Sequence, residues 1–221
     1  MSRIIFISGT DTGIGKTWVA TALVRALRAS GLRVAVRKPA ESGCERVDGV
    51  LVATDAEALR AAAASDETIE VICPLRLAEP LAPGIAARRA GETLDVDAFV
   101  VATLERAAEV DMLLVEGAGG LLVPLMGRLS CADLALRLDA ELLIVVGARL
   151  GAINHALLTE AAALAAGLRI LGFVVNHNES GEDLARSTLV EALREFAESP
   201  VLAEIGHGSD GIAALQDLLL R

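Results

Sequence analysis

Residues 9–17 read Gly9-Thr10-Asp11-Thr12-Gly13-Ile14-Gly15-Lys16-Thr17, a glycine-rich stretch that ends in Gly-Lys-Thr. A short apolar run typical of a buried strand precedes it, and an Ala- and Leu-rich segment with helical spacing follows it. Glycines let successive backbone N–H groups face one anion, and the N-terminus of the following helix adds partial positive charge. The stretch therefore predicts a phosphate-binding loop. An ordinary glycine-rich turn is the alternative, and the Gly-Lys-Thr triplet between strand and helix argues against it.

Two side chains of this loop have predicted roles toward a nucleotide. Lys16 is placed to reach the terminal phosphates, and the Thr17 hydroxyl is placed to bind Mg²⁺. The strict pattern GxxxxGK(S/T) is not met, because Thr10 stands where its first glycine belongs. The residues predicted to bind the nucleotide here are Gly13, Ile14, Gly15, Lys16 and Thr17.

Apolar runs alternate with helical segments along the rest of the chain. Strands are predicted at residues 4–8, 33–37, 111–115, 142–146 and 170–175, with a weaker candidate at 201–205. Helices are predicted at residues 18–29, 56–64, 96–108, 156–166 and 184–196. The strand runs are continuously apolar, which is typical of parallel strands covered on both faces. The pattern predicts an α/β fold, a P-loop NTPase-like doubly wound and mainly parallel sheet flanked by helices.

This alternation extends over the whole chain, so a single domain spanning residues 1–221 is predicted. Residues 38–89 fit the alternation less well and are rich in Pro, Gly and Glu. This segment is predicted to form functional loops around one short helix.

The charge balance and the cysteines narrow the class of partner and the compartment. The chain has 30 acidic against 20 basic residues, which argues against nucleic acid, because binding phosphates requires clustered Lys and Arg. Its apolar stretches are interrupted well before the ~20 residues that span a bilayer, and no basic leader precedes them, so no membrane association is expected. Cys44, Cys73 and Cys131 are far apart and form no CxxC pair, which favours reduced thiols in a cytoplasmic protein.

Lysine is nearly absent, since only Lys16 and Lys38 occur among the 20 basic residues. Lys38 comes just after the strand predicted at 33–37. Ligands bind beyond the carboxyl ends of the strands in open α/β sheets, so Lys38 and Lys16 are predicted to share one site. The alternative is a solvated lysine beside Arg37. Glu116 follows the strand predicted at 111–115 and is placed to bind Mg²⁺, unless it faces solvent at the strand end.

Four motifs occur in a fixed order: GTDTGIGKT at 9–17, KPxxSG at 38–43, VEGAGG at 115–120 and GxINH at 151–155. Together they resemble the dethiobiotin synthetase family, over residues 4 to about 205. The resemblance implies an ATP- and Mg²⁺-dependent carbon–nitrogen ligase of biotin biosynthesis. Its substrates would be 7,8-diaminononanoate and CO₂ or bicarbonate. One amine becomes a carbamate, ATP phosphorylates the carbamate, and the second amine displaces phosphate to close a ureido ring.

The resemblance also implies residue roles around the first three motifs. Lys38, Lys16 and Thr12 would be catalytic, with Thr12 contacting the substrate amines or the nascent carbamate. Ser42 would hydrogen-bond the substrate. Asp55 would bind Mg²⁺ together with Thr17 and Glu116. From the residues alone, Thr54-Asp55-Ala56-Glu57 is a capping box that accounts for Asp55, although both interpretations are compatible.

The late part of the chain has roles implied in the same way. The segment Gly151, Ala152, Ile153 and Asn154 would reach the substrate tail from the opposite subunit, which implies a homodimer with sites at the interface. An N-cap role for Asn154 is the alternative, and His155 is expected to pack. Asn176 would contact the adenine base.

Three departures from the family pattern concern the substrate and the base. Gly13 stands where some members have Glu, and Gly84 stands where His is frequent. The late base loop, commonly PxLGxIP, reads Pro-Val-Leu-Ala-Glu-Ile-Gly at 200–206, and His177 replaces the usual Asp.

A P-loop ATPase switch of the partitioning or septum-positioning type is the competing function. An amidotransferase synthetase fragment is disfavoured because the chain is too short for a glutaminase domain.

Overall fold

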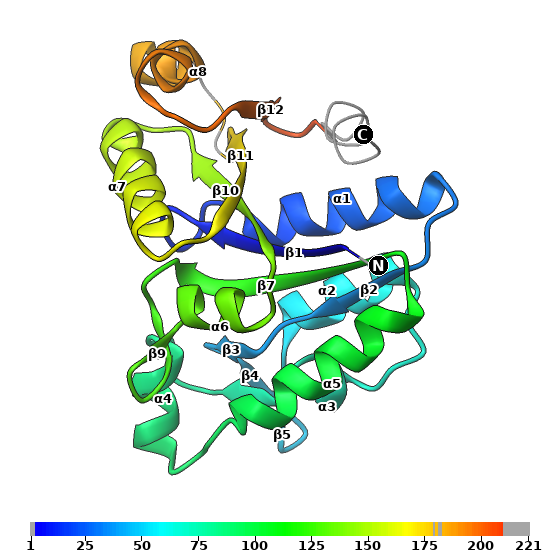
Figure 1. Ribbon diagram of the computed structural model, residues 1–221. Helices are drawn as coiled ribbons and strands as arrows, with labels where there is room; N and C mark the ends of the chain where they lie inside the picture. Colours follow the sequence, from blue (N-terminus) through cyan, green and yellow to red (C-terminus); the bar gives the residue numbers. More distant parts are fainter. Residues whose placement is uncertain (1–2, 179, 181–182, 210–221) are drawn as a thin grey trace.

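Six parallel strands form the central sheet of the computed structural model, which describes residues 3–178, 180 and 183–209 (Figure 1). Their order across the sheet is β12-β11-β10-β1-β7-β2. This arrangement confirms the predicted fold class and the weaker sixth strand. The bounds of the strands are β1 (Arg3–Gly9), β2 (Val34–Arg37), β7 (Met112–Gly120), β10 (Glu141–Gly147), β11 (Arg169–Asn176) and β12 (Val201–Ile205).

Helices cover both faces of this sheet. Alternate residues of β1 serve the two faces: Ile5 and Ile7 belong to one buried cluster, and Phe6 belongs to the other. The first cluster packs under α1 (Lys16–Ala29) and α2 (Thr54–Ala63). The second packs under α5 (Val96–Glu109), α6 (Cys131–Arg137), α7 (Ala152–Ala165) and α8 (Leu184–Phe196). Burial on both faces explains why the strands read as continuous apolar runs.

The segment 38–89 is more ordered than predicted, so the prediction of loops around one short helix is wrong. Besides α2 it contains a parallel pair of short strands, an antiparallel hairpin and two further helices. Strands of three residues are too short to give a periodic signal in the sequence. These elements are β3 (Ala40–Ser42), β4 (Glu45–Val47), β5 (Val50–Val52), α3 (Ile69–Ile72), β6 (Leu75–Leu77) and α4 (Pro83–Ala90).

Parallel pairing brings the carboxyl ends of all six strands to one edge of the sheet. At this edge β1 enters the glycine-rich loop, β2 leads into Lys38, and β11 ends at Asn176. β7 continues to Gly120 rather than stopping at Val115, and it is followed by the small pair β8 (Pro124–Met126) and β9 (Leu129–Ser130). Among the described residues, no helix combines the length and the apolar character needed to cross a membrane.

Candidate active site

The glycine-rich loop joins β1 to α1 and contacts the end of β11. Gly15 precedes the helix with φ 87°, a left-handed conformation, and a Cβ built there would lie 2.2 Å from the Asn176 side-chain nitrogen. Only glycine fits this position without strain. The Asn176 Nδ2 donates to the Ile14 carbonyl at 2.8 Å, so the amide fixes the loop just before the helix begins.

Lys16 begins α1, and its ammonium lies within the loop. Its Nζ donates to the Asp11 carbonyl at 3.0 Å, and the side chain is buried. Burial lowers the pKa of Lys16, and the nearby Glu116 carboxylate opposes this effect only in part. A buried cation that is incompletely neutralised favours the approach of an anion such as phosphate. At the loop tip, the Thr12 N–H donates to Asp11 Oδ1 at 2.7 Å, and Arg149 forms an ion pair with the same carboxylate.

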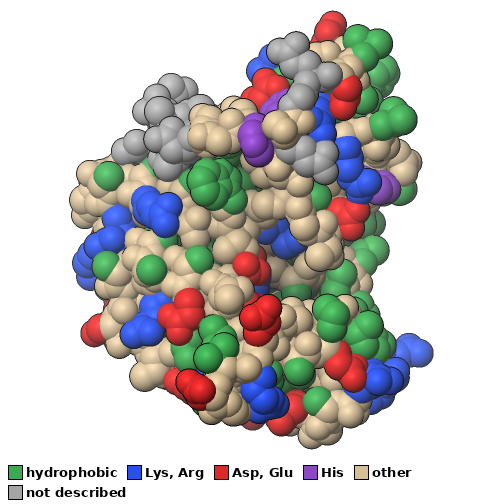
Figure 2. Space-filling model, turned by 180° about the vertical axis from the view of Figure 1, so that it is seen from behind, with side chains coloured by type: hydrophobic (Ala, Val, Ile, Leu, Met, Phe, Trp, Pro, Cys, Tyr) green, Lys and Arg blue, Asp and Glu red, His purple; other side chains and the backbone are tan. Residues whose placement is uncertain are grey.

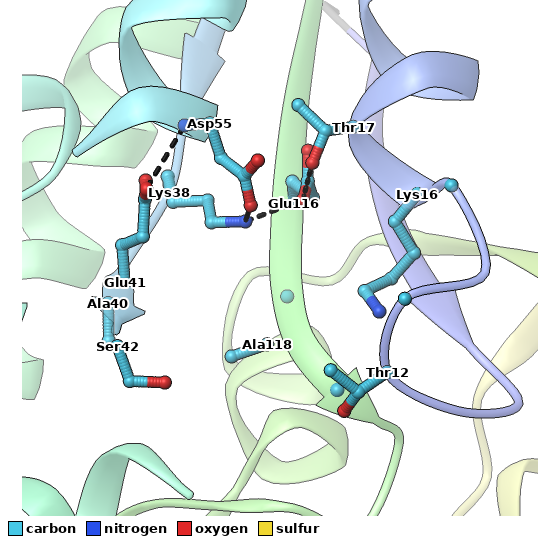
Figure 3. A pocket seen from close by; sticks show the side chains of 14 residues that line it. Thr12, Lys16, Thr17, Lys38, Ala40, Glu41, Ser42, Asp55, Glu116 and Ala118 are labelled. Atoms are coloured by element: carbon cyan, nitrogen blue, oxygen red, sulfur yellow. Dashed lines mark hydrogen bonds and ion pairs between the residues drawn. The ribbon is translucent and has the colours of Figure 1, made fainter. Parts of the chain in front are cut away.

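A second group of side chains meets beside the loop, from β2, α2, β7 and α1 (Figure 3). The ammonium of Lys38 lies 2.8 Å from Asp55 Oδ2 and 2.5 Å from Glu116 Oε1. The Thr17 hydroxyl donates to Glu116 Oε1 at 2.8 Å. The four residues therefore form one network in space although they are far apart in the chain.

The burial of Lys38 and Glu116 excludes two alternative interpretations that the sequence left open. Lys38 is 3% exposed, so it is not a solvated lysine beside Arg37. Glu116 is 1% exposed and lies inside β7, so it is not a strand-terminal carboxylate facing solvent.

The charges of this network stabilise one another. Burial alone would lower the pKa of Lys38, but the Glu116 and Asp55 carboxylates outweigh burial, and the pKa is raised. Burial opposes ionisation of Asp55 as well, yet the adjacent Lys38 ammonium and the Thr17 hydroxyl hold the pKa of Asp55 below its ordinary value. Lys38 is therefore an ammonium and Asp55 a carboxylate at neutral pH.

The oxygen atoms of this group fit a magnesium ion. Glu116 Oε2 is buried and has no hydrogen-bond partner, whereas a buried carboxylate oxygen is normally paired. Thr17 and Asp55 supply further hard oxygen donors beside it. The described residues hold no cluster of three or more His, Cys, Asp or Glu side chains suited to a metal. Two carboxylates and a hydroxyl agree with Mg²⁺, which keeps several waters and binds substrate phosphates.

These side chains border one cavity of about 350 Å³ at the carboxyl edge of the sheet. Figure 2 shows the molecule hollowed on one side, with acidic and basic side chains inside the recess. Most of the residues predicted for the phosphates, the metal and the reacting substrate line this cavity; Ile14 is buried behind the loop instead. Those that line it are Thr12, Gly13, Gly15, Lys16, Thr17, Lys38, Ser42, Asp55 and Glu116.

A second cavity of about 320 Å³ adjoins the first, since Gly15 lines both. Asn176 and the half-exposed Trp18, which lies in the first turn of α1, line this second cavity. Trp18 was not predicted as a site residue, because an aromatic residue in an amphipathic helix is usually part of the core. The remaining lining residues are His177, Asn178, Gly206, His207 and Gly208.

The segment 151–154 starts α7 but lines neither of these two cavities. Gly151 is the N-cap residue with φ 90°, and the helix begins at Ala152. The alternative N-cap role for Asn154 is therefore wrong, because Asn154 lies inside the first turn and is exposed. The predicted contact of this segment with a substrate stays a prediction.

The start of α2, which carries Asp55, also differs from the sequence interpretation. Thr54 is the first helical residue and not the cap, and the N-cap Ala53 has no side-chain cap. Glu41 supplies the missing hydrogen bonds from β3. Glu41 was not predicted from the sequence, because a carboxylate that bonds across two elements leaves no local pattern.

A P-loop, a parallel sheet and convergent lysine and carboxylate side chains define a P-loop nucleotide-dependent protein. Residues 3–210 match the family described as AAA domain. Solved structures of P-loop proteins have the same fold. The septum site-determining protein MinD with Mg-ADP from Pyrococcus horikoshii OT3 is 20% identical with a TM-score of 0.62, covering 99% of this chain and 94% of that one. A ParA family ATPase from Chlorobium tepidum TLS is 14% identical with a TM-score of 0.58, covering 99% and 91%.

Relatives at higher identity give the particular family. An ATP-dependent dethiobiotin synthetase BioD from Anaeromyxobacter dehalogenans strain 2CP-C is 48% identical over 181 residues, which are 82% of this chain and 79% of the relative. The BioD of Aromatoleum aromaticum is 40% identical over 205 residues, 93% and 91% of the two chains. The chain belongs to the dethiobiotin synthetase family. The likeness to the MinD and ParA structures shows the fold alone, so the competing switch function has less support.

Proposed function

We propose that this enzyme of the dethiobiotin synthetase family closes a ureido ring on 7,8-diaminononanoate with CO₂ and ATP, using the 350 Å³ cavity as its reaction centre. The observation that carries the proposal is the convergence of the phosphate-binding Lys16 with Lys38, Asp55 and Glu116 around that cavity. The single domain is proposed to span the chain, and the three buried, free cysteines agree with a cytoplasmic enzyme.

The first step joins one substrate amine to CO₂. The amine nitrogen bonds to the carbon of CO₂ as one C=O π bond opens onto oxygen, and the ammonium proton passes to water, which gives a carbamate. Lys38, Ser42 and Thr12 all line the cavity, so an ammonium and two hydroxyl groups can hold the carbamate and the diamine. Lys38 remains protonated because of its carboxylate neighbours, and its role is to stabilise negative charge rather than to accept a proton.

The second step transfers a phosphoryl group. A carbamate oxygen bonds to the γ-phosphorus as the bond to ADP breaks, and Lys16 together with the loop N–H groups of Gly13 and Gly15 holds the phosphates. Thr17, Asp55 and Glu116 would bind Mg²⁺, which neutralises phosphate charge when it is bound. The second amine then attacks the carbamoyl carbon, inorganic phosphate leaves, and the ring closes.

The nucleotide base is assigned to the second cavity. Because Gly15 lines both cavities, a nucleotide whose phosphates lie on the loop can extend its base toward Asn176 and Trp18. The Asn176 Nδ2 is used by the Ile14 carbonyl, so its oxygen is the group offered to the base. Trp18 supplies an aromatic face for stacking.

The working unit is proposed to be a homodimer. The N-terminus of α7 carries the partial positive charge of a helix start, which suits a carboxylate, yet residues 151–154 do not line the reaction cavity of their own chain. Leu150 beside them is 85% exposed, and Leu158 on the same helix is 61% exposed. A partner subunit that covers these leucines would bring the helix start to the substrate tail.

One assay tests this function against the switch alternative. ADP release should require 7,8-diaminononanoate and bicarbonate together and should be accompanied by stoichiometric dethiobiotin. ATP hydrolysis that proceeds without either substrate and rises with DNA or lipid vesicles would support a switch instead.

A further inference from the structure

Glu41 is a buried carboxylate that bonds to the helix bearing Asp55. It lies on β3, is 7% exposed, and both of its oxygens accept backbone N–H groups at the start of α2. Oε1 accepts from Asp55 at 3.0 Å, and Oε2 accepts from Ala56 at 3.0 Å. Figure 3 shows this carboxylate turned toward the backbone of Asp55.

This contact replaces the cap that α2 lacks. The first N–H groups of a helix have no partner within the helix, and neither Ala53 nor Thr54 bonds to them with a side chain. A carboxylate is also stabilised by the partial positive charge at a helix N-terminus. Glu41 therefore fixes the first turn of α2 at the residue whose side chain reaches Lys38.

We propose that Glu41 is a positioning residue that holds Asp55 in place for the metal and thereby links the substrate-binding segment 38–42 to the metal site. This inference rests on the proposed function, which assigns Asp55 to Mg²⁺. Glu41 acts through the backbone of Asp55, and its own oxygens are occupied by N–H donors. Residues that orient metal ligands typically contribute 10–100-fold to metal affinity.

Mg²⁺-assisted nucleotide binding measures this role without catalysis. The dissociation constant of a non-hydrolysable ATP analogue is measured by calorimetry, once with MgCl₂ and once with EDTA. The constant in EDTA divided by the constant in MgCl₂ gives the contribution of Mg²⁺ to binding. In Glu41→Ala we expect the ratio to fall by about tenfold, while binding in EDTA stays within about twofold of the wild type.

Asp95→Ala is the matched control. Asp95 is also a carboxylate cap, accepting from the Ala98 N–H at 2.9 Å at the start of α5, but α5 carries none of the proposed metal ligands. Each variant removes one helix cap, so a general loss of stability is common to both. We expect Asp95→Ala to keep the wild-type ratio. An unchanged ratio in Glu41→Ala, or an equal fall in Asp95→Ala, would overturn the proposal.

Two further variants keep the test decisive. Glu41→Gln retains one acceptor oxygen, so it should fold even if Glu41→Ala does not, and its ratio should fall less than in Glu41→Ala. In Asp55→Ala the ratio should be low, and adding Glu41→Ala should lower it no further, because the two residues act as one unit. Additive losses would contradict the proposal. Absence of dethiobiotin formation by the wild type would instead contradict the proposed function and leave these ratios interpretable.

Discussion

Lys38 and Glu116 form a buried ion pair, with Nζ 2.5 Å from Oε1 and both side chains less than 5% exposed. Removing the Lys38 ammonium would leave the Glu116 carboxylate buried without its ion-pair partner, which typically costs about 3–5 kcal/mol. Asp55 shares the same ammonium, so Lys38 contacts both carboxylates assigned to the metal. This arrangement keeps Lys38 positively charged at the centre of the cavity.

Replacing Lys38 by arginine should nearly abolish dethiobiotin formation, by at least about 10²-fold in kcat. The charge is retained, but the planar guanidinium cannot occupy the position of a compact ammonium between two carboxylates. ATP affinity should stay within a few-fold, because the phosphates are assigned to the loop. Arg60→Lys, an exchange in a partly exposed pair with Glu57, is the control and should be active. Normal turnover in Lys38→Arg would exclude the proposed role.

Glu116→Gln should weaken the Mg²⁺-dependent part of ATP affinity by about tenfold or more. The variant keeps the side-chain shape and an oxygen that accepts from Thr17. It removes the negative charge and replaces the second carboxylate oxygen by an amide nitrogen, which cannot bind a metal ion. Calorimetry with and without MgCl₂ measures the effect. Glu67→Gln, which alters the Arg37 ion pair away from the cavity, should lower stability without this change. The metal assignment fails if the two variants bind Mg²⁺-ATP alike.

Binding of ATP should quench the fluorescence of Trp18, the single tryptophan of the chain. Base stacking on an aromatic side chain contributes about 1–3 kcal/mol, so Trp18→Ala should raise the ATP dissociation constant by about tenfold. Tripolyphosphate has no base and should neither quench nor distinguish the variant from the wild type. Equal quenching by tripolyphosphate would contradict the assignment of the base to the second cavity.

Mixing two inactive variants should restore activity if the α7 start serves the opposite subunit. Lys38→Ala disables the reaction cavity, and a bulky Gly151→Trp disables the tail contact, each expected to be inactive as a homodimer. Random exchange in a C2 dimer gives heterodimers with one intact site, about a quarter of all sites. Refolding the two variants together, with each alone as the control, measures recovery. No recovery despite exchanged subunits would show that Lys38 and Gly151 of the same chain serve one site, which contradicts the proposal.

The cap of α6 should make stability depend on pH through Asp133. The Ser130 N–H and hydroxyl both donate to Asp133 Oδ2 at 2.7 Å and hold the pKa of Asp133 below its ordinary value of 3.8. A depressed carboxyl pKa stabilises the folded state above pH 3.8, and this contribution is lost as pH falls through the folded value. Asp133→Asn should therefore cost about 1 kcal/mol at pH 7 and progressively less below pH 3.8, as measured by urea unfolding. Glu105→Gln, at an exposed position of α5, should show no such trend.

The core strands and the phosphate loop were predictable because their signals are local. A buried parallel strand must be continuously apolar, and a phosphate cradle must combine glycine, lysine and a helix start within a few residues. The helix boundaries differ from the prediction by a few residues, as for α7, which begins at Ala152 rather than Ala156. The short strands β3 to β6 were missed because three residues carry no periodicity.

Local sequence patterns were sufficient to predict that a P-loop precedes α1, that Lys38 and Glu116 each follow a parallel strand, and that both lie near the loop. The folded structure was needed to show that Lys38 pairs with Glu116 and Asp55, that Trp18 borders a second cavity, and that Glu41 rather than Thr54 bonds to the start of α2. The physical reason is that burial and side-chain pairing depend on packing between distant segments, whereas strand, loop and helix signals depend on neighbours in the chain.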